Sequence, residues 1–220
     1  MKSLPDTLAH SDYLAATAKY AEWAPKPLAA FEQLAQATFT DGALSTKEKE
    51  LIAVACSHVV RCAYCIDYHV GLATDAGASE PEISESIWVG ITLAAGACFS
   101  HSDLAARRMK KPEKDYYPRE KTPDFTALAS ANPAAYAAYV DLNHAAFQDG
   151  EVPARLKRLT AIACAHNTRC PMCIEHHVSS ALEAGEEKPA IAEAIWVAIE
   201  IGAGASFGHA GLAAALMATK

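Results

Sequence analysis

Two short patterns of cysteine and histidine place nucleophilic side chains close together. Both have the spacing Cys-x-x-Cys-x-x-x-His, and their members are Cys62, Cys65 and His69, and Cys170, Cys173 and His177. A thiolate is a strong nucleophile, and a histidine one helical turn away can take the proton of the thiol. The cysteine three residues earlier can then attack an oxidised sulfur and close a disulfide. The spacing therefore predicts thiol redox chemistry at two sites.

Two other uses of these side chains stay open. Two cysteines and a histidine can supply three ligands of a structural or regulatory zinc site. The cysteine pairs of such zinc sites usually lie about 15–20 residues apart, whereas these pairs recur at a distance of 108 residues. Redox chemistry is therefore the preferred interpretation. A purely structural disulfide is the remaining alternative.

The chain consists of two copies of one unit. Leu51–Val70 and Leu159–Val178 are identical at eleven of twenty positions, and the similarity continues on both sides. We expect a first repeat over residues 1–110, a linker over 111–123 and a second repeat over 124–220. The linker is predicted because this stretch is charged and rich in proline. A repeat of this length has the size of a domain, which indicates a gene duplication rather than a solenoid.

Helices are expected throughout, because alanine is abundant and runs of β-branched residues are short. Ser45 and Glu48 form a predicted capping box for a helix that continues to about Val60. Pro153 is expected in the first turn of the equivalent helix in the second repeat. Later helices over residues 83–99 and 191–207 are nearly all apolar, which suits the middle of a helical bundle or an oligomer interface.

The second repeat indicates where the helix that carries each cysteine pair begins. Proline is favoured at the first helical position, and Pro171 follows Cys170 directly. Cys170 is therefore the predicted N-cap, and Cys62 is its counterpart in the first repeat. Cys65 and Cys173 then lie in the first turn, where unpaired N–H groups and partial positive charge lower the pKa of a thiol. Glycines at positions 77 and 185 are expected to end these helices.

A carboxylate joins the first pattern only. Glu50 lies twelve residues before Cys62 on the preceding predicted helix, on the same face as His58. If this face meets the cysteine helix, Glu50 can orient His69 or pass it a proton. The second repeat has Arg158 at the equivalent position, and an arginine can stabilise a thiolate but cannot act as a base. We therefore expect the first site to be the more active one.

The remaining cysteines, the paired histidines and two tryptophans are predicted to be structural. Apolar helical surroundings place three cysteines in the expected core, namely Cys56, Cys98 and Cys164. Trp88 and Trp196 are expected to anchor that core. Four histidines recur in both repeats and are expected to pack, or alternatively to stand beside the sites: His58 and His166, and His101 and His209.

Composition excludes several classes of function. The chain has 220 residues and a net charge of -7 without a basic stripe, which argues against nucleic-acid binding. No apolar run reaches the 18 or so residues that span a bilayer, so we expect no membrane helix. The N-terminus shows no secretory signal, and a cytoplasmic location is expected. In that compartment seven cysteines are not expected to form a disulfide framework.

At these residues the sequence resembles the carboxymuconolactone decarboxylase superfamily, and within it the alkylhydroperoxidase D branch. The resemblance rests on Glu50, Cys62, Cys65 and His69 with the spacing Glu-x11-Cys-x-x-Cys-x3-His. It covers nearly the whole chain, since both repeats resemble the helical unit of the family. It implies an all-α fold with two alkylhydroperoxidase D-like repeats, and homo-oligomers, with a trimer expected and a dimer as the alternative. It also implies that Cys65 is the peroxidatic and Cys62 the resolving cysteine, with His69 and Glu50 as a proton relay.

The resemblance implies a thiol peroxidase without a cofactor or metal. Such an enzyme would reduce hydroperoxides and be reduced again by a dithiol or a lipoyl protein. The sequence departs from the better-known members in having a cysteine pair in both repeats, and in having Tyr64 and Met172 where they have a histidine. Two alternatives remain: a non-redox decarboxylase or lactone-processing enzyme with His58, His69 or their counterparts as acid-base groups, and a metal- or redox-responsive binding protein without turnover.

Overall fold

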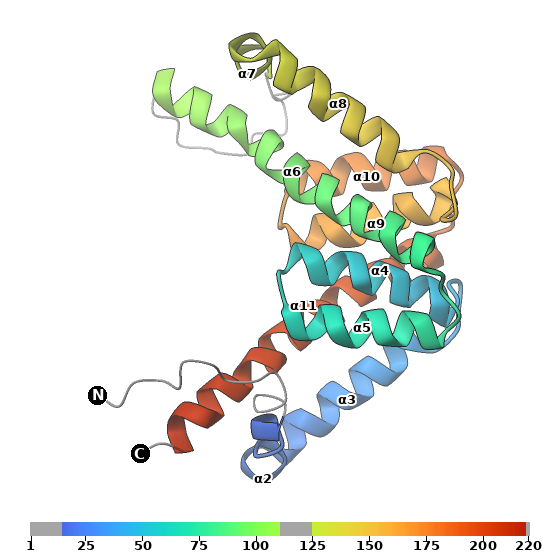
Figure 1. Cartoon of the computed structure of the whole chain (residues 1–220), viewed down its shortest axis with the longest axis vertical. Helices are drawn as coiled ribbons and strands as arrows, with labels where there is room; N and C mark the ends of the chain where they lie inside the picture. Colours follow the sequence, from blue (N-terminus) through green and yellow to red (C-terminus); the bar gives the residue numbers. More distant parts are fainter. Residues whose placement is uncertain (1–14, 111–124, 219–220) are drawn as a thin grey trace.

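The computed structural model describes residues 15–110 and 125–218, which form helices joined by short turns (Figure 1). No strand occurs among these residues, and the predicted all-α fold is confirmed. The expected linker over residues 111–123 lies outside the described residues. The helices are α2 (Tyr20–Trp23), α3 (Pro25–Phe39), α4 (Thr46–Val59), α5 (Ala63–Asp75), α6 (Glu80–Lys110), α7 (Thr126–Ala131), α8 (Pro133–Phe147), α9 (Ala154–Asn167), α10 (Pro171–Glu183) and α11 (Lys188–Ala218).

The ends of the helices follow local signals in the sequence. The hydroxyl of Ser45 accepts the N–H of Glu48, whose carboxylate accepts the N–H of Ser45 at 2.8 Å, so the predicted capping box is confirmed. Gly77 and Gly185 follow α5 and α10 with φ angles of 84° and 87°, a left-handed conformation that favours glycine. Pro153 is the N-cap of α9 rather than its first helical residue, because its ψ angle of 143° is extended. That prediction was wrong by one position.

The last helix of each repeat packs on the other repeat. In the fold, α11 contacts α3, α4 and α5, while α6 contacts α8, α9 and α10 (Figure 1). Glu193 of α11 accepts the N–H groups of Ala43 and Leu44 at 2.8 and 2.9 Å and pairs with Lys49 at 3.0 Å. Glu85 of α6 makes the equivalent contacts with the second repeat. The two repeats are therefore intertwined around a shared core.

The centre of that core is formed by α4 and α9. Residues 51–57 and 159–165 are buried, and the sulfur atoms of Cys56 and Cys164 lie 4.0 Å apart where the two helices meet. The hydrogen bond with Cys56 and burial raise the pKa of the Cys164 thiol, which keeps it protonated. The core prediction is confirmed for these two cysteines. It was wrong for Cys98, which is exposed on α6.

The two long helices leave apolar side chains uncovered. Trp88 on α6 and Trp196 on α11 are 48% and 51% exposed, so their prediction as core anchors was wrong. By length and composition alone, 80–102 and 188–217 are also apolar enough to cross a membrane, although we expected no such segment from the sequence. Within this fold 28% and 39% of their most apolar windows are buried. These helices therefore combine packing in the core with a large exposed apolar face.

Candidate active site

Both cysteine patterns begin a helix, as the sequence predicted. Cys62 is the N-cap of α5, and its sulfur accepts the N–H of Cys65 at 3.2 Å. Cys170 caps α10 in the same way. The preceding residues, Arg61 and Arg169, have φ angles of 57° and 56°. This left-handed conformation costs a non-glycine residue about 1–2 kcal/mol, and it turns each chain sharply into the cysteine helix.

Each cysteine pair is joined by a disulfide. The bonds link Cys62 to Cys65 and Cys170 to Cys173, and the Cα atoms are 5.2 Å apart in both. Cys62 and Cys170 have no exposed surface, whereas Cys65 and Cys173 are each 6% exposed. The second cysteine of each pair is therefore the one that a small molecule can reach.

A buried carboxylate and histidine stand beside the first pair. His69 Nδ1 lies 2.8 Å from Glu50 Oε2, and both side chains are buried. Because an ionised carboxylate only accepts hydrogen bonds, we assign the proton of the neutral imidazole to Nδ1 and the lone pair to Nε2. The rings of Phe39 and Tyr68 flank the imidazole, with centroids 5.4 and 5.1 Å away. The pair is thus held in a fixed orientation, with one basic nitrogen.

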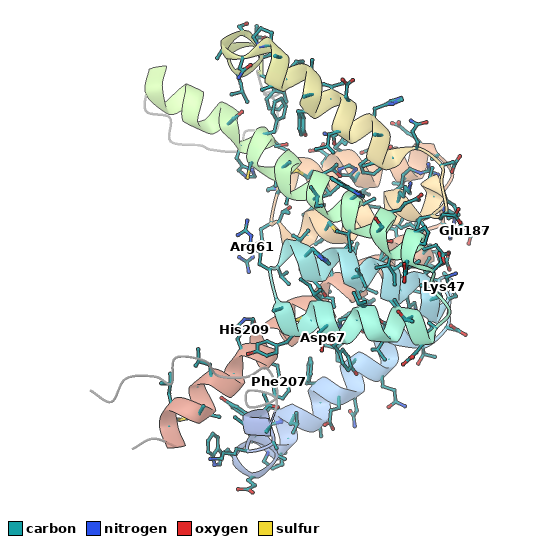
Figure 2. All side chains as sticks on the ribbon, in the orientation of Figure 1. Lys47, Arg61, Asp67, Glu187, Phe207 and His209 are labelled. Carbon is teal, nitrogen blue, oxygen red and sulfur yellow. A yellow bond between two sulfur atoms is a disulfide. The ribbon has the colours of Figure 1, made fainter. Side chains whose placement is uncertain are left out.

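A cavity of about 590 Å³ opens onto this site between α3, α4, α5 and α11. Cys65 and His69 line it, and much of the remaining wall is aromatic or aliphatic: Leu28, Phe31, Phe39, Tyr64 and Phe207. Figure 2 labels two of the lining residues, Asp67 on α5 and Phe207 on α11. The charged lining residues other than histidine are all carboxylates: Glu32, Glu50, Asp67 and Glu200.

Glu200 was not predicted to belong to the site. It comes from α11 of the second repeat, is 5% exposed, and lines the cavity of the first repeat. Burial raises the pKa of its carboxyl group; nearby His69 lowers it and Glu50 raises it further. The available sequence signal is an acidic residue inside the apolar stretch 191–207, where the first repeat has Thr92.

The second site lacks the carboxylate partner. Arg158 donates from Nη2 to Glu186 Oε1 at 3.1 Å. The imidazole of His177 instead stacks on Phe147, with centroids 5.9 Å apart, and meets His176 edge-on at 4.9 Å. Burial, and then the charge of His176, lower the pKa of His177 to about 4. This imidazole is therefore a weak proton acceptor at neutral pH.

One hydroxyl distinguishes the second thiol. The Oγ of Ser100 on α6 lies 3.7 Å from the Sγ of Cys173, within reach of a weak hydrogen bond. The position equivalent to Ser100 in the other repeat is Gly208, which lines the first cavity without a side chain. The two sites therefore share their backbone geometry but differ in the groups that surround the sulfur.

The recurring histidines bond within their own helices. In each, Nδ1 lies 2.7–2.8 Å from the carbonyl oxygen four residues earlier, which favours the packing interpretation for His58, His166, His101 and His209. Among residues 15–110 and 125–218, no three His, Cys, Asp or Glu side chains are grouped as metal ligands would be. The zinc alternative therefore has no support from this geometry.

Two known proteins resemble part of this chain in sequence. A protein of the cox locus of Paracoccus denitrificans is 46% identical over 76 residues, which are 34% of this chain and 68% of that protein. A protein of Cupriavidus necator is 40% identical over 80 residues, 36% of this chain and 71% of its own length. Both relatives are described as uncharacterized proteins. The matched segment is about twice as large a share of each relative as it is of this chain, so each relative is about half as long as this chain. Half of the chain is about the length of one repeat.

The fold of the whole chain is also known. A crystal structure from Burkholderia xenovorans, of a protein assigned as a gamma-carboxymuconolactone decarboxylase subunit, superposes with a TM-score of 0.67 at 19% identity. The match covers 97% of this chain and 93% of that one, and at this identity it concerns the fold alone. The model of the carboxymuconolactone decarboxylase family matches residues 25–108 and again residues 133–216. The chain therefore belongs to the carboxymuconolactone decarboxylase family and contains two of its units in tandem.

Proposed function

We propose that the chain is a thiol peroxidase that reduces hydroperoxides at the first cysteine pair. The observation that carries this proposal is the buried Glu50–His69 pair beside the Cys62–Cys65 disulfide, at the wall of one cavity. A helix N-terminus, a histidine base and a resolving cysteine are the three parts that thiol-based peroxide reduction needs. The second pair, without an acid, is proposed to be a weaker or differently tuned thiol site.

The proposed cycle has three balanced steps. His69 takes the proton of the Cys65 thiol, and the thiolate attacks one peroxide oxygen, which breaks the O–O bond and leaves that oxygen on sulfur as a sulfenic acid. The departing oxygen takes up a proton from the site to become an alcohol, and the proton on His69 makes good this loss. The thiol of Cys62 then displaces hydroxide from this sulfenic acid, and its proton completes a water molecule as the disulfide forms. A dithiol, such as a lipoyl protein, reduces the disulfide and becomes a disulfide itself.

The lining of the cavity supports this proposal over a decarboxylase or lactone-processing enzyme. Carboxymuconolactone carries ionised carboxylates at neutral pH, and a site for such a substrate needs cationic groups. Four acidic side chains line the first cavity, and no Lys or Arg does so among the residues that the structure describes. A neutral hydroperoxide meets no such repulsion in an aromatic and acidic cavity.

Consumption of a hydroperoxide with dihydrolipoamide as the reductant tests the proposal. The duplication supplies a matched pair of variants, Cys65→Ser and Cys173→Ser. We expect the first to abolish turnover and the second to retain most of it, because only the first site has the acid. The proposal fails if the variant with both substitutions consumes peroxide at the wild-type rate. Turnover of a muconolactone by a variant without the four motif cysteines would support the decarboxylase alternative instead.

The proposal extends to partners and location. A dithiol or lipoyl protein is the proposed reductant, and the exposed apolar faces of α6 and α11 are proposed to join copies of the chain in a homo-oligomer. A cytoplasmic location accords with a dithiol reductant.

A further inference from the structure

We propose that Glu200 of the second repeat donates the proton that the departing peroxide oxygen needs when Cys65 of the first repeat attacks. This inference rests on the proposed peroxidase function. It assigns a catalytic proton donor outside the Glu-Cys-Cys-His pattern of the first repeat, and it makes the first site a product of both repeats.

The position of Glu200 is the first observation. The helix α11 runs past α3, α4 and α5, and it brings this carboxyl group to the wall of the cavity that Cys65 and His69 also line. His69 and Glu50 both shift the pKa of Glu200, so the three groups lie close enough for electrostatic interaction. A hydroperoxide bound against Cys65 would therefore lie within the same small space as the Glu200 carboxyl group.

The second observation is that Glu200 has a buried oxygen that the fold leaves unsatisfied. Its Oε2 atom is buried and has no hydrogen-bond partner in the described part of the protein. An unpaired buried carboxyl group costs free energy, in the range of about 1–3 kcal/mol for a polar group. The equivalent Thr92 in α6 avoids this cost by donating its hydroxyl to Val89 O at 2.8 Å. The fold thus accepts a satisfied residue at the equivalent position, and only the first site has the acid.

The two buried acids then have different tasks because their surroundings differ. Glu50 is bonded to His69 and holds the imidazole as the base for the thiol. Burial is the largest influence on the pKa of Glu200 and favours its neutral, protonated form; His69 acts in the opposite direction, and the charge of Glu50 again favours the neutral form. The neutral carboxyl group can give a proton away. Pairs of carboxyl groups that are tuned apart in this way divide base and acid functions in other enzymes.

The proton balance is closed within the site. The thiol proton of Cys65 goes to His69, and the thiolate attacks one oxygen of the hydroperoxide. The O–O bond breaks, the electron pair goes to the leaving oxygen, and Glu200 protonates that oxygen to give the alcohol. The proton held by His69 then returns to the carboxylate of Glu200, so both groups regain their starting states while Cys65 becomes a sulfenic acid.

A comparison of leaving groups tests this assignment. The reduced protein is mixed in single turnover with tert-butyl hydroperoxide, whose leaving alkoxide is strongly basic, or with peracetic acid, whose leaving acetate needs no proton. For Glu200→Gln we expect the rate with tert-butyl hydroperoxide to fall by about 10²–10⁴-fold, the usual contribution of general acid catalysis. The rate with peracetic acid should fall by less than about threefold, because no such catalysis is required.

The matched control is Thr92→Val, at the equivalent position of the other repeat, which should change neither rate. Equal losses for both peroxides would show that Glu200 is merely structural, and unchanged rates would show that it takes no part. Either result overturns the inference while leaving the peroxidase proposal intact. If the wild-type protein reduces neither peroxide, the proposed function itself fails.

A measurement on the wild-type protein covers the case in which the variant does not fold. When the rate with tert-butyl hydroperoxide is divided by the rate with peracetic acid, the effect of thiol ionisation cancels. This ratio should fall as pH rises, because Glu200 loses its proton. No titratable group of α9 lines this cavity, and the other titratable groups that line it lie on α3, α4 and α5: Glu32, Glu50, Tyr64, Cys65, Asp67, Tyr68 and His69. A ratio that shows no fall as pH rises above the ordinary titration range of a glutamate contradicts the proposal.

Discussion

The Glu50–His69 contact predicts how readily the first cysteine pair ionises. Glutamine in place of Glu50 can still accept the Nδ1 hydrogen bond, but it carries no charge to stabilise the imidazolium that forms when Nε2 takes the thiol proton. Hydrogen bonds to charged groups contribute about 1.5–3 kcal/mol, and those between neutral groups about 0.5–1.5 kcal/mol. The midpoints of these ranges differ by about 1.3 kcal/mol, which corresponds to nearly a tenfold loss in the reactivity of Cys65. Because both partners are buried, solvent will not compensate.

Alkylation of the reduced protein measures this effect directly. Iodoacetamide labels each thiol at a rate that follows its ionised fraction, and mass spectrometry of the peptides separates Cys65 from Cys173 in the same molecule. In Glu50→Gln we expect labelling of Cys65 to slow about tenfold while that of Cys173 is unchanged. The matched variant Arg158→Gln should leave Cys65 unaffected. The reasoning is refuted if a folded Glu50→Gln protein labels Cys65 at the wild-type rate, or if both cysteines slow equally.

Three further outcomes follow from the same geometry. The pKa of His177 is lowered to about 4 in the folded protein, so the unfolded chain takes up a proton at this histidine first as pH falls. The free energy of unfolding should therefore decrease by about 3 kcal/mol between about pH 6.5 and about pH 4. Urea unfolding at several pH values should show this loss in the wild type and not in His177→Phe. The double substitution Arg158→Glu and Glu186→Ala gives the second site an acid at the position of Glu50 and should raise the pKa of His177, measured by NMR titration. An unchanged pKa would count against a contact between His177 and the acid introduced at position 158. Replacing exposed Trp88 and Trp196 with serine should lower the mass measured by analytical ultracentrifugation, and a monomeric wild-type protein would overturn the proposed oligomer.

Signals that act within a few residues were readable from the sequence. The capping box at Ser45, the N-cap positions of the cysteines and the glycines that end α5 and α10 are each fixed by local hydrogen bonds and backbone conformation. The Glu50–His69 contact was also anticipated, because both residues lie on consecutive helices and one helical face points to the next. Such features depend on neighbours in the chain, and those are visible in the sequence itself.

Contacts between the repeats were not readable in this way. An apolar helix does not reveal which of its faces another helix covers, so the sequence misplaced Trp88, Trp196 and Cys98 in the core. Glu200 was missed for the same reason, since its proximity to His69 depends on α11 crossing to the first repeat. Alignment of the two repeats pairs each residue with its equivalent in the other repeat. The first site instead combines Glu50 of the first repeat with Glu200 of the second, and these two positions are not equivalent.

This exchange of helices explains why the two sites differ so consistently. Each site combines a residue from the helix before its own cysteine helix, α4 or α9, with a residue from the last helix of the other repeat, α11 or α6. The first site therefore combines Glu50 of α4 with Glu200 of α11, both acids, on one cavity. At the corresponding positions the second repeat supplies Arg158 on α9, and the first repeat supplies Thr92 on α6. A substitution in either repeat changes only one site, so a duplicated chain can keep both acids at one cysteine pair while the other pair loses both. The two acids are thus expected to act as one unit. The fold-loss in peroxidase rate when Glu50 and Glu200 are both replaced should be smaller than the product of the fold-losses of the two single variants.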